Sequence, residues 1–190
     1  MGSSALASSL VTNGGFETGD FTGWTHGGDT SYTTVNPDTD YAWQPSHSGN
    51  YRAVLGPGFY NGTLTQTLST VAGDSYTLSY WLANDVDAFG TYPPAGAGND
   101  FELSWNGSTI TSMLNQNMFG WVNYTMNLTA TGSSTDLIFS FYNYAGYYYL
   151  DDVSVVDNGP IGAVPEPASL LLMGSGLLGL SGIIRRRLNK

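Results

Sequence analysis

An alternation of apolar and polar side chains with a period of two residues is the strongest constraint on the fold of this chain. In segment 76–82, apolar side chains fill the even positions, while Thr77, Ser79 and Trp81 fill the odd ones. Because successive side chains of a β-strand point to opposite faces of a sheet, this pattern predicts a strand with one buried face. The other segments with this alternation, or with a short apolar run between turn residues, are 51–55, 63–68, 101–105, 122–128, 137–142 and 149–156.

Composition favours the same fold class. The chain has 25 Gly and 13 Tyr, while Lys and Arg together number five, so strand and turn formers outnumber good helix formers. With a short strand in segment 10–24, about eight closely spaced strands are expected, without helices between them. We therefore predict an all-β fold for residues 10–157, an antiparallel β-sandwich of the jelly-roll type. The absence of cysteine excludes disulfides and thiol chemistry.

Charge is distributed unevenly along the chain. Of the 15 acidic residues only Glu166 lies beyond residue 164, so 14 acids against the single Arg52 give residues 1–164 a net charge of −13. Proteins bind nucleic acid through Lys and Arg on its phosphates, and this composition excludes that function. The charge favours solubility, divalent cations and neutral partners such as sugars. The alternative interpretation is the solvated surface of an exported protein.

The first nine residues are small and polar, and we expect them to be a leader remnant or a disordered start. They contain no basic region followed by an apolar one, so they do not form a complete signal peptide. Ala5-Leu6-Ala7 nevertheless fits the pattern at which a signal peptide is cleaved. Because export needs a leader, a leader upstream of these residues is expected.

The C-terminal segment 165–190 combines a rigid break, an apolar run and a basic end. Its apolar run, residues 168–184, would form a helix about 25 Å long, which is the short end of a membrane span. The prolines before the run define the start of the helix, and the basic tail 185–190 should stay cytoplasmic. We predict a transmembrane helix at 168–184, after a Gly/Pro linker at 158–164, with the preceding domain outside the cytoplasm. A buried core helix is the alternative.

The three parts of this segment, in this order, resemble the PEP-CTERM sorting signal of Gram-negative bacteria. The residues that carry the resemblance are Pro165, Glu166 and Pro167, then the apolar run, then Arg185, Arg186 and Arg187. The resemblance implies a membrane processing enzyme of the exosortase type as a partner, and an association with exopolysaccharide and biofilm. It also implies export and inner-membrane anchoring, followed by transfer to the cell surface or the extracellular matrix.

Residues 10–157 resemble the carbohydrate-binding modules that have a galactose-binding-like jelly roll. Asn13-Gly14-Gly15-Phe16-Glu17, followed by Gly23-Trp24, is similar to their opening strand, and Tyr149–Val155 is similar to their closing strand. Ser48–Tyr51 and Gly73–Leu78 fit the beginnings of strands between them. The resemblance implies a β-sandwich and, less specifically, the binding of a polysaccharide.

The same resemblance implies a structural calcium ion held by Glu17 and Asp151. Calcium prefers six to eight oxygen ligands, and carboxylates from remote strands would cross-link the sandwich. Alternation favours Asp151 over Asp152 as the calcium ligand. Val153 and Val155 should face the core, and Asp151 would point to the same side of the strand. The alternative role of Glu17 and Asp151 is to cap backbone amides in a turn.

Sugar binding needs exposed aromatic rings for stacking, with polar groups nearby for hydroxyls. Trp43, Trp81 and Tyr92 are the candidates that we select, because Trp81 should face away from the core and the other two lie in long loops. The alternative is that such aromatic rings make cross-strand pairs on an outer face. The further aromatic candidates are Tyr60, Phe119 and Tyr147.

The sequence contains no motif typical of an enzyme. His26 and His47 are the only histidines, both in loop-like segments, and neither belongs to a catalytic or metal-binding motif. We therefore expect a non-catalytic surface or matrix protein that associates with extracellular polysaccharide. A structural matrix protein without a small ligand is the first alternative, and a polysaccharide-active enzyme with two placed carboxylates is the second.

Overall fold

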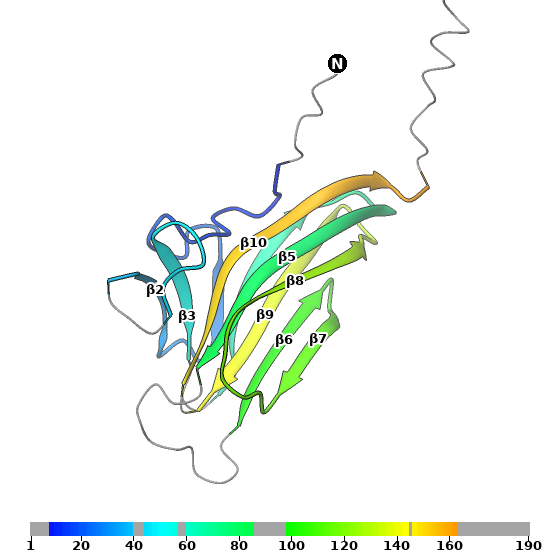
Figure 1. Ribbon diagram of the computed structural model, residues 1–190. Coiled ribbons are helices and arrows are strands. Elements are labelled where there is room, and N and C mark those ends of the chain that lie inside the picture. The colour runs from blue at the N-terminus through cyan, green and yellow to red at the C-terminus, as the bar shows by residue number, and fades with distance from the viewer. Residues whose placement is uncertain (1–7, 40–43, 57–59, 86–97, 145, 163–190) are drawn as a thin grey trace, which may run out of the picture. The chain divides into compact units, whose positions relative to one another are not determined.

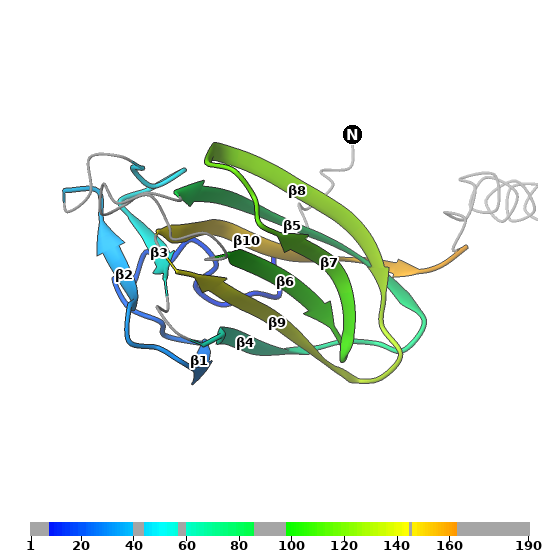
Figure 2. The same ribbon diagram turned by 90° about the horizontal axis from the view of Figure 1, so that it is seen from below.

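The alternating segments form strands, and the strands form two five-stranded antiparallel sheets (Figures 1 and 2). The computed structural model describes residues 8–39, 44–56, 60–85, 98–144 and 146–162. Within them the strands are β1 (Thr25–Gly28), β2 (Thr33–Pro37), β3 (Tyr51–Leu55), β4 (Gly62–Ser69), β5 (Asp74–Asp85), β6 (Asn99–Trp105), β7 (Ser108–Leu114), β8 (Phe119–Thr129), β9 (Ser134–Asn143) and β10 (Tyr147–Pro160). One sheet has the order β1-β4-β9-β6-β7, and the other has the order β2-β3-β10-β5-β8.

The inner faces of the two sheets enclose one hydrophobic core. In β5 the four apolar side chains at positions 76 to 82 are fully buried, while Trp81 lies on the opposite face and is half-buried. Phe101 of β6 and Phe139 of β9 pack against Tyr80 from the other sheet. The prediction of an all-β antiparallel sandwich is therefore confirmed, and the described residues contain no helix.

The sequence-based strand assignment did not include β1, β2 or β7. β1 and β2 lie in segment 25–50, whose Gly, Pro and polar residues obscure any alternation. Each is short and lies at a sheet edge, β1 beside β4 and β2 beside β3. An edge strand with few residues buries little apolar surface, so it leaves only a weak trace in the sequence pattern.

The two ends of the sandwich domain also differ from expectation. Segment 10–24 contains no strand but is a series of turns bound to β10: the amide of Leu10 donates to Val155 O at 2.8 Å, and the amide of Val153 donates to Gly14 O at 2.9 Å. At the other end, β10 continues to Pro160, which pairs with Asp74. Residues 158–160, which were expected to be linker, therefore belong to the sheet.

A bulge in β10 overturns the expected direction of the Asp151 side chain. Asp151 pairs with Trp81, the register then shifts before Ser154, and Asp152 has a φ of 49°. Directly opposed residues of an antiparallel pair share a face, so Asp151 lies on the outer face with Trp81. Val153 and Val155 still reach the core because the bulge changes the alternation between them and Asp151.

The predictions for the C-terminal segment concern residues that the structure does not describe. Pro165, Glu166, Pro167, Arg185, Arg186, Arg187 and the run 168–184 all lie outside the described residues. In the part of the chain that is described, we find no helix whose length and apolar character would let it span a membrane. Contacts within the chain divide it after Pro160, and the transmembrane helix stays a prediction.

We expect Gly14→Ala to detach the N-terminal turns from β10. A Cβ at Gly14 would clash with Val153 O, so the hydrogen bond between the two backbones must break or move. The free energy of unfolding, measured by urea denaturation, should fall by about 3 kcal/mol. Gly132→Ala is the matched control, because its Cβ would meet nothing closer than 3.6 Å. An equal effect of the two substitutions would contradict this role of the turns.

Candidate functional site

Asp151 is a fully buried carboxylate that holds a loop onto the outer face of β10. Its Oδ2 accepts hydrogen bonds from the amides of His47 at 2.8 Å and Ser48 at 3.3 Å, and its Oδ1 accepts one from the amide of Asp152 at 2.7 Å. Burial first, and then the neighbouring Asp152 carboxylate, raise the pKa of Asp151 to about 7, while the three amides oppose the rise. Within the described residues, no cationic side chain forms an ion pair with Asp151.

Asp152 binds the side chains of the same loop. Its Oδ2 lies 2.6 Å from Nδ1 of His47, and its Oδ1 accepts a hydrogen bond from Ser48 Oγ at 2.7 Å. The positive φ of Asp152 turns its side chain toward the loop, while Asp151 takes the backbone amides. The bulge thus lets two consecutive carboxylates bind one loop. We call residues 44–50 the 44–50 loop.

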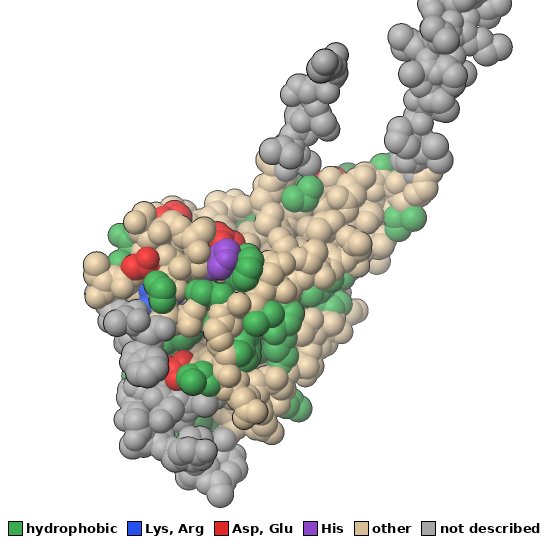
Figure 3. Space-filling view, viewed as in Figure 1, with side chains coloured by type: hydrophobic (Ala, Val, Ile, Leu, Met, Phe, Trp, Pro, Cys, Tyr) green, Lys and Arg blue, Asp and Glu red, His purple; other side chains and the backbone are tan. Residues whose placement is uncertain are grey.

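Two tryptophans fix the 44–50 loop from the side of β5 and β8. The His47 ring stacks on Trp81 with 3.6 Å between centroids, and it meets Trp121 edge-on at 6.0 Å. Trp121 also donates its Nε1 hydrogen to Pro45 O at 2.9 Å. Figure 3 shows acidic and hydrophobic side chains next to a histidine on the face of the domain that it draws. The ring of Trp81, which was predicted to stack on a sugar, is therefore stacked on His47 in this structure.

Glu17 caps the end of the same loop. Its carboxylate accepts hydrogen bonds from the amides of Asn50 and Tyr51, with Oε1 at 2.9 and 3.0 Å. A Cβ on Gly49 would clash with this carboxylate, so the close approach of the loop requires glycine there. Both Glu17 and Asp151 thus cap backbone amides, which is the alternative role considered for them in the sequence.

The surroundings of Gly15 fit a divalent cation in part. Glu17 Cγ and Asp151 Oδ1 each lie 3.8 Å from the point where a Cβ of Gly15 would stand, and Asp152 Oδ1 lies 3.4 Å from it. Carboxylate oxygens are the donors that calcium prefers, and the buried Asp151 has no cationic partner among the described side chains. Among the described residues, however, no group of three or more His, Cys, Asp or Glu side chains is arranged to hold a metal. Backbone carbonyls or water would have to complete such a site.

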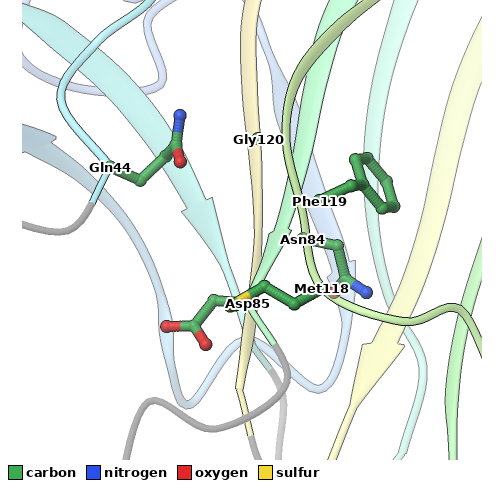
Figure 4. Close-up of a pocket in the computed structure, with 6 residues that line it drawn as sticks. All are labelled: Gln44, Asn84, Asp85, Met118, Phe119 and Gly120. Atoms are coloured by element: carbon green, nitrogen blue, oxygen red, sulfur yellow. The ribbon is translucent and has the colours of Figure 1, made fainter.

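A pocket of about 260 Å³ opens beside the start of the 44–50 loop. It is lined by Gln44 of the loop, Asn84 and Asp85 at the end of β5, and Met118, Phe119 and Gly120 at the start of β8. Figure 4 shows Gln44, Asp85 and Met118 around the opening, while the Phe119 ring points away from it. Met118 is 61% exposed, so the pocket offers an apolar surface next to an amide and a carboxylate. These are groups that suit a neutral hydroxylated ligand.

Three buried asparagines make the wall of this pocket rigid. The Asn143 amide donates to Asn84 Oδ1 at 2.9 Å, and Asn84 donates in turn to the carbonyls of Gln116 and Asn117. Asn99 exchanges hydrogen bonds with the Gln116 backbone and accepts one from the Tyr148 hydroxyl at 2.7 Å. This network joins the ends of β5, β6, β9 and β10 to the turn before β8, so the pocket is built on fixed backbone.

The structure brings some of the predicted site residues together and leaves others apart. Glu17, Asp151 and Trp81 all contact the 44–50 loop, whereas Trp43 and Tyr92 lie outside the described residues. Of the further aromatic candidates, Tyr60 is exposed, Tyr147 is buried in an outer cluster, and Phe119 packs against the core.

Sequence reasoning missed the roles of His47, Asp152, Trp121 and Gln44. Their contacts join the chain across long separations, such as the 105 residues between His47 and Asp152, so no local motif marks them. The one local signal was the pair of consecutive acids at 151 and 152. Alternation favours Asp151 of the two, whereas the bulge gives both carboxylates a role at the loop.

The comparisons with known proteins identify the C-terminal segment. Residues 163–187 match the family model described as the PEP-CTERM protein-sorting motif. This chain carries a PEP-CTERM sorting signal. The signal implies export and membrane anchoring through the C-terminal region, and the resemblance of this segment is confirmed. No sequence among the curated proteins matches the chain.

Solved carbohydrate-binding modules share the fold of the sandwich. The structure of TmCBM61 in complex with β-1,4-galactotriose is similar with a TM-score of 0.59 and 19% identity, covering 79% of this chain and 99% of that one. The xylan-binding domain CBM22-1 of Paenibacillus barcinonensis Xyn10C has a TM-score of 0.50 and 17% identity, covering 81% and 97%. A family 16 carbohydrate-binding module has a TM-score of 0.50 and 18% identity, covering 77% and 99%. These similarities confirm the jelly-roll fold.

Removal of the Asp152 carboxylate should release the 44–50 loop. Asp152→Gly deletes the bonds to His47 and Ser48 without backbone strain, because glycine accepts the positive φ. Amide hydrogen exchange at residues 46–48 should accelerate about tenfold or more, since each bond to a charged group contributes about 1.5–3 kcal/mol.

Asp152→Asn is the graded control for this experiment. Asparagine also tolerates a positive φ and keeps one acceptor, so exchange should lie between the wild type and Asp152→Gly. Unchanged exchange in Asp152→Gly would show that Asp151 and the two tryptophans hold the loop without Asp152.

Proposed function

We propose that this protein is an exported, non-catalytic polysaccharide-binding protein. The observation that carries the proposal is the sorting motif at 163–187 on a chain whose upstream domain is a single jelly-roll sandwich. In this proposal an exosortase-type enzyme processes the tail after export, and the sandwich is delivered to the cell surface or the extracellular matrix. The sandwich then associates with extracellular polysaccharide there.

The proposed binding site is the pocket at the start of the 44–50 loop. Gln44 and Asp85 supply hydrogen-bonding groups for hydroxyls, and Met118 supplies an exposed apolar surface. Gln44 follows the predicted stacking residue Trp43 in the chain, and Asp85 precedes the segment that contains Tyr92. The strong negative charge of the domain also suits a neutral glycan better than an anionic one.

A bound calcium ion is a second part of the proposal. Glu17 and Asp151 would hold it, with backbone carbonyls and water as the remaining ligands, and its charge would compensate the buried Asp151 carboxylate. Such an ion would stabilise the 44–50 loop, since both carboxylates already contact that loop. Its role is structural, and no catalytic step depends on it.

Glycan binding should depend on the residues of the pocket. We expect Gln44→Ala and Asp85→Asn each to weaken binding to β-1,4-galactan, xylan or another neutral polysaccharide about tenfold, which corresponds to about 1.4 kcal/mol. Affinity electrophoresis of the full chain in gels that contain each polysaccharide measures this effect. Trp43→Ala in the same gels tests the sequence-based prediction for that residue.

Asp136→Asn is the matched control for Asp85→Asn. Asp136 is exposed near the start of β9, about 23 Å along the strand from Asn143, which adjoins the pocket. The control should bind within about twofold of the wild type. Retarded migration in none of the polysaccharides, or equal losses in the two Asp variants, would overturn the proposed site.

Calcium removal should lower the thermal stability of the domain. At a concentration 100 times its dissociation constant, a bound ion adds about 2.7 kcal/mol, so a chelator should lower Tm by about 5–10 °C. Glu17→Gln and Asp151→Asn should both abolish the difference between calcium and chelator. An identical Tm of the wild type in the two conditions would exclude the structural ion and leave the glycan site untouched.

A further inference from the structure

Strand β8 is a long sheet edge that, within the described residues, has little protection against pairing; the one register shift of its pairing with β5 lies near its start, between Leu82 and Asn84. Within the described residues β5 is its one neighbour, and the two strands pair without a break from Val122 to Thr129. Figures 1 and 2 show β8 at the outside of its sheet, next to β5. The strand contains no Asp, Glu, Lys, Arg or Pro, which are residues that commonly prevent edge pairing.

The other three edges of the sandwich differ from β8. β1 and β2 have four and five residues, and β2 ends at a proline. β7 has seven residues, and a register shift between Leu103 and Ser104 interrupts its pairing with β6. Short length, proline and bulges are the usual means by which a protein limits edge-to-edge contact. With its 11 residues, β8 is the longest edge strand among the described residues and has no proline or charge.

We propose that β8 pairs with β8 of a second copy of this chain, antiparallel about a two-fold axis at Tyr124. This register aligns the whole strand, because Phe119 then faces Thr129 of the second copy. The interface is isologous, so one patch serves both copies. The pairing joins the two β8-containing sheets into one continuous sheet of ten strands.

The side chains in the middle of β8 complement themselves in this register. Asn123 lies opposite Thr125 of the second copy, so an amide meets a hydroxyl on the outer face. Val122 lies opposite Met126 of the second copy, and Val122 is 40% exposed in the single chain. Polar therefore meets polar and apolar meets apolar at these two pairs nearest the axis, whereas Trp121 faces Asn127 and Phe119 faces Thr129.

The distribution of charge also favours β8 as the edge at which two copies of the chain meet. The chain carries a net charge of −10 with only five basic residues, so two copies repel each other over most of their surface. The neutral β8 brings the backbones together where neither strand adds to this repulsion. Anchoring by the C-terminal region would also raise the local concentration of copies at a membrane.

Charged substitutions test the proposed pairing in the full chain. In the double variant Asn123→Asp/Thr125→Asp, like charges face each other across the two-fold axis. Sedimentation velocity in detergent, with micelles in molar excess over protein, should show a wild-type dimer whose dissociation constant rises at least about tenfold in this variant. An equimolar mixture with Asn123→Lys/Thr125→Lys should restore dimers, since opposite charges then face each other.

Ser133→Asp/Ser134→Asp is the control for added charge. Both serines are exposed, Ser133 in the turn between β8 and β9 and Ser134 at the start of β9, and neither belongs to β8, so this variant should dimerise like the wild type. A wild-type chain that stays monomeric up to about 1 mM would overturn the proposal, and so would equal dimerisation of the wild type and the Asp/Asp variant.

Cross-linking reports the register directly, because the chain has no cysteine of its own. Opposed Cα atoms in an antiparallel pair are about 4.5–5.5 Å apart, within the range of a disulfide. Under oxidation, a mixture of Asn123→Cys and Thr125→Cys chains should give a disulfide-linked heterodimer, and each variant alone should give far less. Equal cross-linking in the three samples would contradict the Tyr124 axis. Neither experiment depends on a glycan, so each can fail independently of the proposed function.

Discussion

The burial of Asp151 beneath the 44–50 loop is the interaction on which the rest of the site depends. A buried carboxylate must be compensated, and here three backbone amides accomplish this, two of them from the loop itself. The loop is therefore bound where the carboxylate is, on the outer face of β10. From there His47 reaches Trp81, Pro45 reaches Trp121, and Gln44 reaches the pocket. The bulge at Asp152 makes this possible because Val153 and Val155 return to the core while Asp151 faces away from it.

Much of the fold can be read from the sequence, because burial of one sheet face leaves a period of two. Segment 76–82 is the clearest example: each residue lies on the face that its parity predicts. The direction of Asp151 was not predictable in this way, since one extra residue at a bulge reverses the parity and leaves no mark in composition. Short edge strands such as β1 and β2 were missed because they bury little. The site was predictable only in part. The resemblance placed Glu17 and Asp151 together at one corner of the sandwich. A contact between residues more than a hundred positions apart, such as that of His47 with Asp152, leaves no local pattern in the sequence.

The sorting signal concerns where the protein goes, and the sandwich concerns what it can bind. The signal implies that the chain is exported and anchored, and its match covers residues 163–187. The sandwich provides a rigid support for binding, because a network of buried asparagines fixes the ends of four strands beside the pocket. Pairing of two copies through β8 would place two such pockets in one assembly. Weak contacts of each copy with a repeating polymer would then reinforce each other.

Hydrogen–deuterium exchange of the full chain, with and without a bound neutral polysaccharide, is the most direct measurement of where the protein binds. We expect the polysaccharide to slow exchange at residues 44–48, 84–85 and 118–121, which surround the pocket and the start of the 44–50 loop. The Ser- and Thr-rich outer face of the other sheet, for example Thr63, Thr65 and Ser140, should exchange at an unchanged rate. Protection of that face with none at the pocket would contradict the proposed site. A polysaccharide that slows exchange nowhere would contradict the binding function itself.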